Sequence, residues 1–174
     1  MPHGLIISLD IAGRTGVCEG LPGQTPKLYS QKFALEDDTS PTVAFGRAVS
    51  FMALRLQIVD PIAVFVEEAV PEFAFAGRTN HAATMIRTGL YGALTGVARA
   101  KGIPVIPASI ARVRTNILGR GHGFKGADAK KAVLRVCRER GWNPADNDQS
   151  DAAAVWLWGC AEIERGILDA GLAL

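Results

Sequence analysis

The sequence predicts a single α/β domain. Its central sheet should be mixed, with an antiparallel meander of three strands plus two parallel strands, and helices should flank it. The 174 residues suffice for one sizeable core, because 48% are hydrophobic and 21% are charged. Short β-branched runs come first and helical patterns then alternate with apolar runs, which is typical of this class. No internal repeat or low-complexity segment interrupts the order, so residues 1–174 are expected to form one domain.

The first part of the chain predicts the meander. Residues 5–10 are apolar and β-branched, and a glycine-containing turn leads from them into a second short strand that begins at Val17 and Cys18. After a loop at residues 21–26, residues 27–33 form the third strand. A hairpin extended by one strand follows from this order.

A helix and a buried strand are expected next. Ser40 and Pro41 form a favourable helix start, and Asp60 followed by Pro61 stops this helix, which should cover the sheet. Residues 62–66 are wholly apolar, as expected of a central strand that is buried on both faces.

The middle of the chain predicts a long helix and a second buried strand. The helix runs from about Thr79 to Lys101, where Gly102 closes it. Val105 and Ile106 then form a short strand. This alternation of helix and strand supplies the parallel half of the sheet.

Three further helices are expected in the last third. One starts at Ser109 and precedes a glycine-rich, mobile basic loop at residues 119–126. Asp128 caps the next helix, and Gly141 ends it. The last helix spans about residues 149–167.

Cysteine usage and hydropathy favour a cytoplasmic protein. The cysteines Cys18, Cys137 and Cys160 are odd in number and far apart, so we expect reduced, mostly buried thiols. No apolar run approaches the roughly 20 residues that span a bilayer, and the first residues lack the pattern of a signal peptide. We therefore expect no membrane association.

The net charge of +2 conceals a concentrated basic segment. Residues 112–140 hold nine Lys and Arg against two Asp and Glu, so this segment carries +7 and the remainder of the chain carries −5. Such asymmetry indicates an anionic partner, although a solvated helix face rich in arginine would show the same pattern.

Two acidic residues stand at the ends of predicted buried strands. Asp10 ends the first strand directly before a turn, so its carboxylate should emerge at the rim of the sheet, although a turn-forming aspartate would occupy the same place. Glu67 ends a buried strand in the same manner, and its neighbour Glu68 should point to the opposite face. The two strand ends can bring Asp10 and Glu67 together.

Two more acidic residues begin the last helix. Asp148 and Asp151 are three residues apart, which places both carboxylates on one face of the first turn. Asp148 can instead be the helix N-cap, and nearby Asp146 competes for either role. Asp151 lies inside the turn and precedes three alanines, whose small side chains let the helix lie close to the sheet.

Four carboxylates from two strands and one helix repel each other unless cations lie among them. Divalent ions with oxygen ligands are the usual solution, so we expect Mg²⁺, or Mn²⁺, at Asp10, Glu67, Asp148 and Asp151. No Cys and His cluster has the spacing of a zinc site. Two ions per site would activate a water and stabilise the leaving oxygen of a phosphodiester.

We therefore interpret the basic segment as a surface that binds nucleic acid. Its side chains would hold the phosphate backbone, namely Arg112, Arg114, Arg120, His122 and Lys125. Lys130 or Lys131, which precede the acidic helix, would stabilise the negative charge that develops on the phosphorus.

Three motifs resemble those of the RuvC-type Holliday junction resolvases, a branch of the RNase H-like nuclease superfamily. ISLDIAGRTGV is similar to the first strand and turn of the family, FVEEAV to its glutamate segment and DQSDAAAVW to its closing helix. By this resemblance the four carboxylates take metal-binding and catalytic positions, and Lys130 in GADAKKAV takes that of a catalytic basic residue, with Lys131 as its rival. The first turn reads Asp-Ile-Ala-Gly where the family usually has Asp-Pro-Gly or Asp-x-Gly, which suggests a divergent, phage-type member.

The resemblance also implies a fold, a substrate and a partner. It implies an RNase H-like fold and a homodimer that binds a four-way DNA junction and nicks two strands symmetrically, leaving 5′-phosphate and 3′-hydroxyl ends. Phe73 or Phe75 would stack on an unpaired base, unless they only pack in the loop, and Arg78 lies in the same DNA-contacting segment. Apart from the resemblance, we expect the helix from about Thr79 to Lys101 to contribute to the dimer, although an apolar helix face is more often core than interface.

Other functions share parts of this pattern. Actin-like sugar kinases and chaperone ATPases also open with a strand, an aspartate and a glycine-containing loop, but they need two such domains to enclose a nucleotide. A non-catalytic nucleic-acid-binding module on the same fold would not need all four acids. A nuclease for another branched or hybrid nucleic acid is the closest competitor.

Overall fold

A five-stranded sheet forms the centre of the protein. The computed structural model describes residues 4–68, 81–119 and 126–168. The strands are β1 (Ile6–Asp10), β2 (Arg14–Gly20), β3 (Lys27–Lys32), β4 (Ala63–Glu67) and β5 (Val105–Ala108). Their order in the sheet is β3-β2-β1-β4-β5, in which the first three are antiparallel and β1, β4 and β5 are parallel. The predicted mixed sheet is therefore confirmed.

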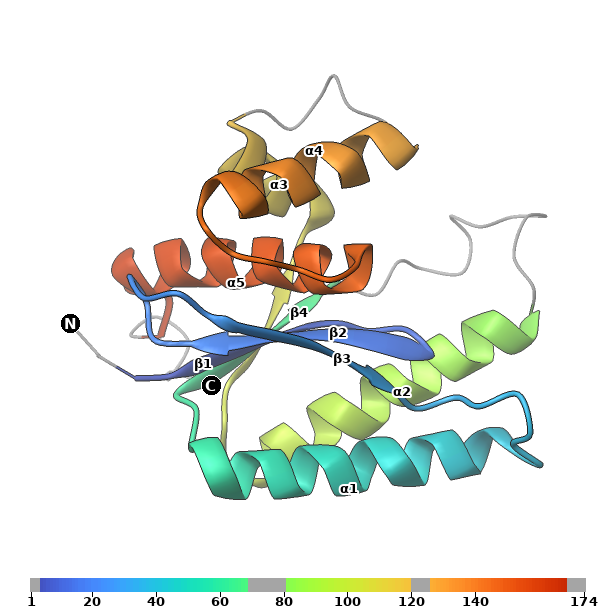
Figure 1. The fold of residues 1–174 in the computed structure, drawn as a ribbon. Helices are drawn as coiled ribbons and strands as arrows, with labels where there is room; N and C mark the ends of the chain where they lie inside the picture. Colours follow the sequence, from blue (N-terminus) through green and yellow to red (C-terminus); the bar gives the residue numbers. More distant parts are fainter. Residues whose placement is uncertain (1–3, 69–80, 120–125, 169–174) are drawn as a thin grey trace.

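Helices cover both faces of this sheet. They are α1 (Pro41–Val59), α2 (His81–Ala100), α3 (Ile110–Leu118), α4 (Gly126–Glu139) and α5 (Asn147–Glu164). Figure 1 shows α1 and α2 on one face and α5 on the other, with α3 and α4 on the outer side of α5. The sheet thus lies between two helical layers, and α5 is enclosed between the sheet and a further pair of helices.

Each face of the sheet has its own hydrophobic core. In β1, Ile7 and Leu9 belong to the core under α1 and α2, whereas Ile6 belongs to the core under α5. Ser8 shares the α5 face, where its fully buried hydroxyl donates a hydrogen bond of 2.7 Å to the carbonyl oxygen of Ala152. This bond attaches α5 to the strand that carries Asp10.

Several element boundaries differ from the prediction, including those of the last helix, α5, which spans Asn147–Glu164 instead of about 149–167. β2 begins at Arg14, three residues before the predicted start, because the hairpin turn is tight: the Thr15 hydroxyl donates to the Ala12 carbonyl at 2.8 Å and accepts from the Ala12 amide at 3.3 Å. Helix α4 begins at Gly126, so Asp128 lies in its first turn and the prediction that it caps the helix is wrong.

Helix α1 is long and apolar enough to cross a membrane by length and composition alone. In the structure its residues Ala44, Ala48 and Met52 are fully buried in the core under the sheet. Farther along the helix, the Arg55 guanidinium donates to the buried carboxylate of Glu19 on β2 at 2.7 Å. Apolar packing and a buried ion pair thus explain α1 as a layer of the domain.

All three cysteines are free and buried, as the sequence predicted. Burial raises the pKa of each thiol: well above its ordinary value for Cys18, to about 11 for Cys137 and to about 12 for Cys160. The thiols are therefore protonated and unreactive in the folded protein at neutral pH.

Candidate active site

Asp10 and Glu67 lie side by side at one edge of the sheet. They end β1 and β4, which pair in parallel, so their carboxyl ends meet at the same edge. Strand alternation places Asp10 on the face of Ser8 and Glu67 on the face of Phe65, and this is the face that α5 covers. Glu68 is exposed and follows the opposite alternation, which distinguishes the two glutamates as predicted.

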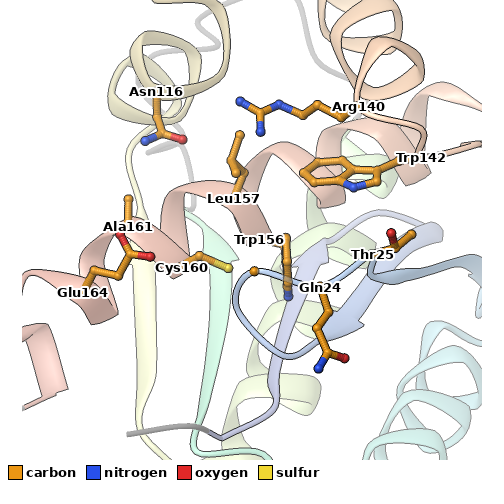
Figure 2. A pocket seen from close by; sticks show the side chains of 11 residues that line it. Gln24, Thr25, Asn116, Arg140, Trp142, Trp156, Leu157, Cys160, Ala161 and Glu164 are labelled. Atoms are coloured by element: carbon orange, nitrogen blue, oxygen red, sulfur yellow. The ribbon is translucent and has the colours of Figure 1, made fainter. Parts of the chain in front are cut away.

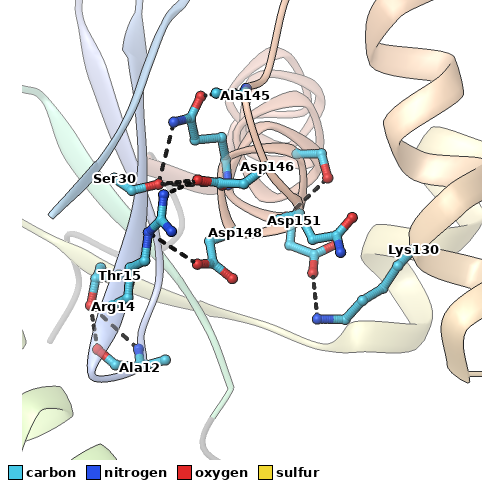
Figure 3. Close-up of polar contacts among 12 residues, drawn as sticks. Ala12, Arg14, Thr15, Ser30, Lys130, Ala145, Asp146, Asp148 and Asp151 are labelled. Atoms are coloured by element: carbon cyan, nitrogen blue, oxygen red, sulfur yellow. Dashed lines mark hydrogen bonds and ion pairs between the residues drawn. The ribbon is translucent and has the colours of Figure 1, made fainter. Parts of the chain in front are cut away.

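The first turn of α5 is held by a cap at Asp146. Its carboxylate accepts a hydrogen bond of 2.8 Å from the Gln149 amide, and the Gln149 side chain accepts one of 2.9 Å from the Ala145 amide. The Ser30 hydroxyl of β3 donates to the same Asp146 carboxylate at 3.0 Å (Figure 3). Because Asp146 is the cap, Asp148 is not, and its side chain is left for another role.

Helix α5 approaches the sheet most closely at this turn. The backbone of Asp148 lies against Gly16 of β2. Gly16 is the residue that pairs with Asp10 of the neighbouring strand β1. Ala152, Ala153 and Ala154, which follow Asp151, are fully buried, as their small size predicted. The packing of small residues thus brings the α5 acids to the edge where β1 ends.

One cavity of about 290 Å³ joins the four predicted acids. It opens at the sheet edge between α5, α2, α3 and α4. Its ionisable lining consists of Asp10, Glu67, Asp148, Asp151, Arg87, Arg114 and Lys130. The structure therefore brings together all four carboxylates that the sequence singled out.

The structure also distinguishes the two candidate lysines. The Lys130 ammonium lies 3.5 Å from Asp151 Oδ2, across from the first turn of α5 (Figure 3). Lys131 is exposed, does not line the cavity and has no ion pair within the described part of the chain. Lys130 is therefore the lysine that faces the acids.

Two basic residues at the acids were not predicted from the sequence. Arg87 of α2 donates from Nη2 to Glu67 Oε1 at 3.1 Å. Arg14 of β2 forms an ion pair with Asp146, and its Nε lies 3.7 Å from Asp148 Oδ2. Both come from elements that are distant in sequence from their partners.

A signal for Arg87 exists in the periodicity of α2. The buried leucines of this helix are Leu90 and Leu94, three and seven residues after Arg87. This spacing places Arg87 on the apolar stripe that faces the rest of the domain. An arginine on such a stripe needs an acidic partner, and Glu67 is that partner.

Burial and mutual repulsion raise the pKa of the acids. The pKa of Asp10 is raised to about 7, first by burial and then by the charges of Glu67, Asp151 and Asp148, whereas Lys130 lowers it. Burial also raises the pKa of Asp151, against the stabilising charge and hydrogen bond of Lys130. Asp10 has no ion pair of its own among the residues that the structure describes.

The donor set suits a hard divalent cation. All four acids offer carboxylate oxygens, which Mg²⁺ and Mn²⁺ prefer, and the crowding at Asp10 would be relieved by positive charge. Within residues 4–68, 81–119 and 126–168, no three Asp, Glu, His or Cys side chains converge closely enough to hold an ion as they lie. Arg14, Arg87 and Lys130 pair with three of the four carboxylates that such an ion would need.

The predicted nucleic-acid contacts are divided between several surfaces. Arg114 lines the cavity of the acids, whereas Arg112 lines a separate hollow beside Trp158. Figure 2 shows a further hollow, of about 490 Å³, which Arg140 and Trp142 line and which none of the predicted contacts lines. The other candidates, Phe73, Phe75, Arg78, Arg120, His122 and Lys125, lie outside the described residues.

The structure resembles solved structures of Holliday junction resolvases. Thermus thermophilus RuvC matches with a TM-score of 0.72 and 20% identity, over 93% of this chain and 96% of that chain. T. thermophilus RuvC in complex with Holliday junction substrate matches with a TM-score of 0.72 and 21% identity, over 94% and 97%. The yeast mitochondrial Holliday junction resolvase matches with a TM-score of 0.62 and 10% identity, over 94% and 83%.

In sequence the chain is more isolated. No protein-family model matches it, and no curated protein is similar to it in sequence. At 20% identity, the structural similarity over nearly the whole chain shows a shared fold and no more. The protein therefore has the RNase H-like fold in the form found in RuvC-type Holliday junction resolvases.

Proposed function

We propose that this protein is a structure-selective endodeoxyribonuclease that resolves four-way DNA junctions by metal-dependent hydrolysis. The observation that carries the proposal is that Asp10, Glu67, Asp148 and Asp151 all line one cavity of a RuvC-type fold. Lys130, 3.5 Å from Asp151, adds a cation at the same cavity. A fold alone supports many functions, so it is the chemistry of this cavity that argues for a nuclease.

The four carboxylates would hold two divalent ions, Mg²⁺ or Mn²⁺. Bound there, such ions supply an activated water and stabilise the leaving oxygen of a phosphodiester. Lys130 and Arg114 line the same cavity, where each would bind phosphate oxygens and stabilise the charge that grows during hydrolysis. The expected products carry 5′-phosphate and 3′-hydroxyl ends.

The choice of a junction as substrate is supported by the likeness to a RuvC structure in complex with Holliday junction substrate. We infer that two copies of this chain act as a homodimer, because paired symmetric nicks need two active sites related by a twofold axis. Recombination and repair intermediates are the DNA species that contain such junctions.

Cleavage of defined substrates tests the proposal. The purified protein is incubated with synthetic four-way junctions, linear duplexes, forks and RNA/DNA hybrids, with Mg²⁺ or Mn²⁺. We expect paired, symmetric nicks near the crossover that DNA ligase can seal. Preferential cutting of hybrids or forks would instead assign another nuclease activity of the same fold, and binding without cutting would indicate a non-catalytic module.

Substitution of single acids tests whether the carboxylates act in cutting and not in DNA binding. Asp10→Asn and Asp151→Asn should abolish cutting and leave junction binding largely intact, because each removes a carboxylate without removing a basic side chain. Loss of binding together with loss of folding would assign these residues a structural role and contradict the proposal.

A further inference from the structure

The guanidinium of Arg87 is placed where a metal ion would have to compete with it. Arg87 donates to Glu67 Oε1 at 3.1 Å and lines the same cavity as the other three acids. Within the described chain, Glu67 has no other ion pair. The side chain of Glu67 is 21% exposed and that of Arg87 is 40% exposed, so the pair is screened in part from water.

We propose that Arg87 is the resident counter-ion of Glu67, which lowers the affinity of the free protein for divalent cations and is released towards substrate phosphate when an ion takes Glu67. This inference rests on the proposed function, because it concerns the same carboxylates. It assigns Arg87 a positioning and regulatory role, distinct from that of Lys130.

A fixed positive charge a few ångströms from a ligand carboxylate opposes a divalent ion there and occupies one of the oxygens that the ion needs. The acids as they lie do not converge on a common point, which fits carboxylates that are held by separate cations. Glu67 is held by α2, Asp151 by α4 and Asp148 by β2.

Release of Arg87 would link metal binding to DNA binding. Once Glu67 is neutralised, the guanidinium at the cavity has no carboxylate partner, and phosphate oxygens are the ligands that suit its planar donors. A divalent ion and a DNA backbone would then each strengthen the binding of the other, as linkage requires. The free protein would thus bind metal weakly until substrate arrives.

The pair contributes little to stability, which makes the test practicable. Partly exposed ion pairs add little to the free energy of unfolding, whereas α2 is held in the core by Leu90, Leu94 and Ala98. Removal of the Arg87 charge should therefore leave the fold intact.

Mn²⁺ titration without DNA, followed by electron paramagnetic resonance and calorimetry, measures the affinity directly. Arg87→Gln removes the charge at the acids. Lys101→Gln makes the same change in net charge just beyond the other end of α2, about 20 Å away along the helix. We expect Arg87→Gln to bind Mn²⁺ about 10-fold more tightly than the wild type. Lys101→Gln should stay close to the wild type.

A second measurement tests the coupling between metal binding and junction binding. With Ca²⁺, which lets junction binding be measured apart from cutting, the metal-dependent increase in junction affinity should be smaller in Arg87→Gln than in the wild type. Thermal unfolding without metal checks the fold. If Arg87→Gln is unfolded, Arg87→Met, which keeps the aliphatic stem, is judged by the same criteria.

The outcomes separate this inference from the proposed function. If the wild type binds Mn²⁺ and Arg87→Gln binds it equally or more weakly, Arg87 only orients Glu67 and the inference is overturned, while the nuclease proposal stands. If the wild type binds no Mn²⁺ and cuts no DNA, both are overturned.

Discussion

A Cβ atom at Gly16 would lie 1.9 Å from the backbone oxygen of Asp148, so no other residue fits at this point of β2 unless α5 moves. Gly16 pairs with Asp10 in the sheet. The closeness of one backbone to another thus determines how near the Asp148 carboxylate comes to Asp10, and the geometry of the acids depends on a residue without a side chain.

Substitution of this glycine tests the dependence. Gly16→Ala should lower the free energy of unfolding by about 1–3 kcal/mol, because α5 must shift to admit the methyl group. Junction cutting should fall by more than the loss of folded protein explains. Gly96→Ala in α2, where a Cβ has open space, is the control and should be neutral or slightly stabilising in urea unfolding. Equal behaviour of the two variants would contradict the close-contact argument.

The raised pKa of Asp10 predicts a pH-dependent stability of the metal-free protein. Its pKa is about 7 in the folded protein and 3.8 in the unfolded chain, so between these values the folded state binds a proton that the unfolded state lacks. The contribution of Asp10 to stability is therefore lost as the pH rises from about 4 to about 7.

Asp10→Asn removes this titration. With a chelator present, the variant should gain about 1–4 kcal/mol relative to the wild type between pH 4 and pH 7.5. Urea unfolding at several pH values measures the difference, and Asp37→Asn serves as a control outside the cavity. A difference that is independent of pH would show that Asp10 is not protonated in the folded state.

Lys130 and Lys131 should differ in which kinetic parameter they change. Lys130→Ala should lower the cutting rate at saturating DNA and metal by about 10²–10³-fold, since it removes a cation beside Asp151. Lys131→Ala should weaken DNA binding and leave the saturated rate unchanged, because its side chain is exposed outside the cavity. Single-turnover kinetics separate the two effects, and a similar loss of rate in both variants would refute the assignment of Lys130.

The glycine-rich basic segment makes a separate prediction about salt. Replacement of Arg120 and Lys125 together by glutamine should weaken junction binding and reduce the slope of its salt dependence by about 2. Fluorescence anisotropy at several salt concentrations measures this slope, and an unchanged slope would remove these two residues from the DNA interface.

Much of the candidate site could be predicted because its signals are local. Strand alternation distinguishes Glu67 from Glu68, and the end of an apolar strand locates Asp10. Helical spacing places Asp148 and Asp151 together. The structure places all four on one cavity, as these local rules imply.

The remaining parts depend on contacts between distant segments. The lysine that faces Asp151 depends on how α4 and α5 pack against each other, which periodicity alone left open. The cap at Asp146 is a local contact, but the choice between Asp146 and Asp148 is fixed together with contacts from the sheet, such as that of Ser30. Arg14 and Arg87 approach the acids because β2 and α2 begin near the same edge of the sheet. The apolar periodicity of α2 gives a signal for Arg87, but nothing in the turn that contains Arg14 indicates its acidic partners.

The buried cysteines allow the opening of the α5 layer to be measured in the natural sequence. Cys18 lies in β2, Cys137 in α4 and Cys160 in α5, and all three thiols belong to the core around α5. A thiol-specific dye would reach them only when that layer opens. Labelling time courses followed by mass spectrometry would therefore record how often α5 separates from the sheet, with no engineered probe and without any assay of DNA.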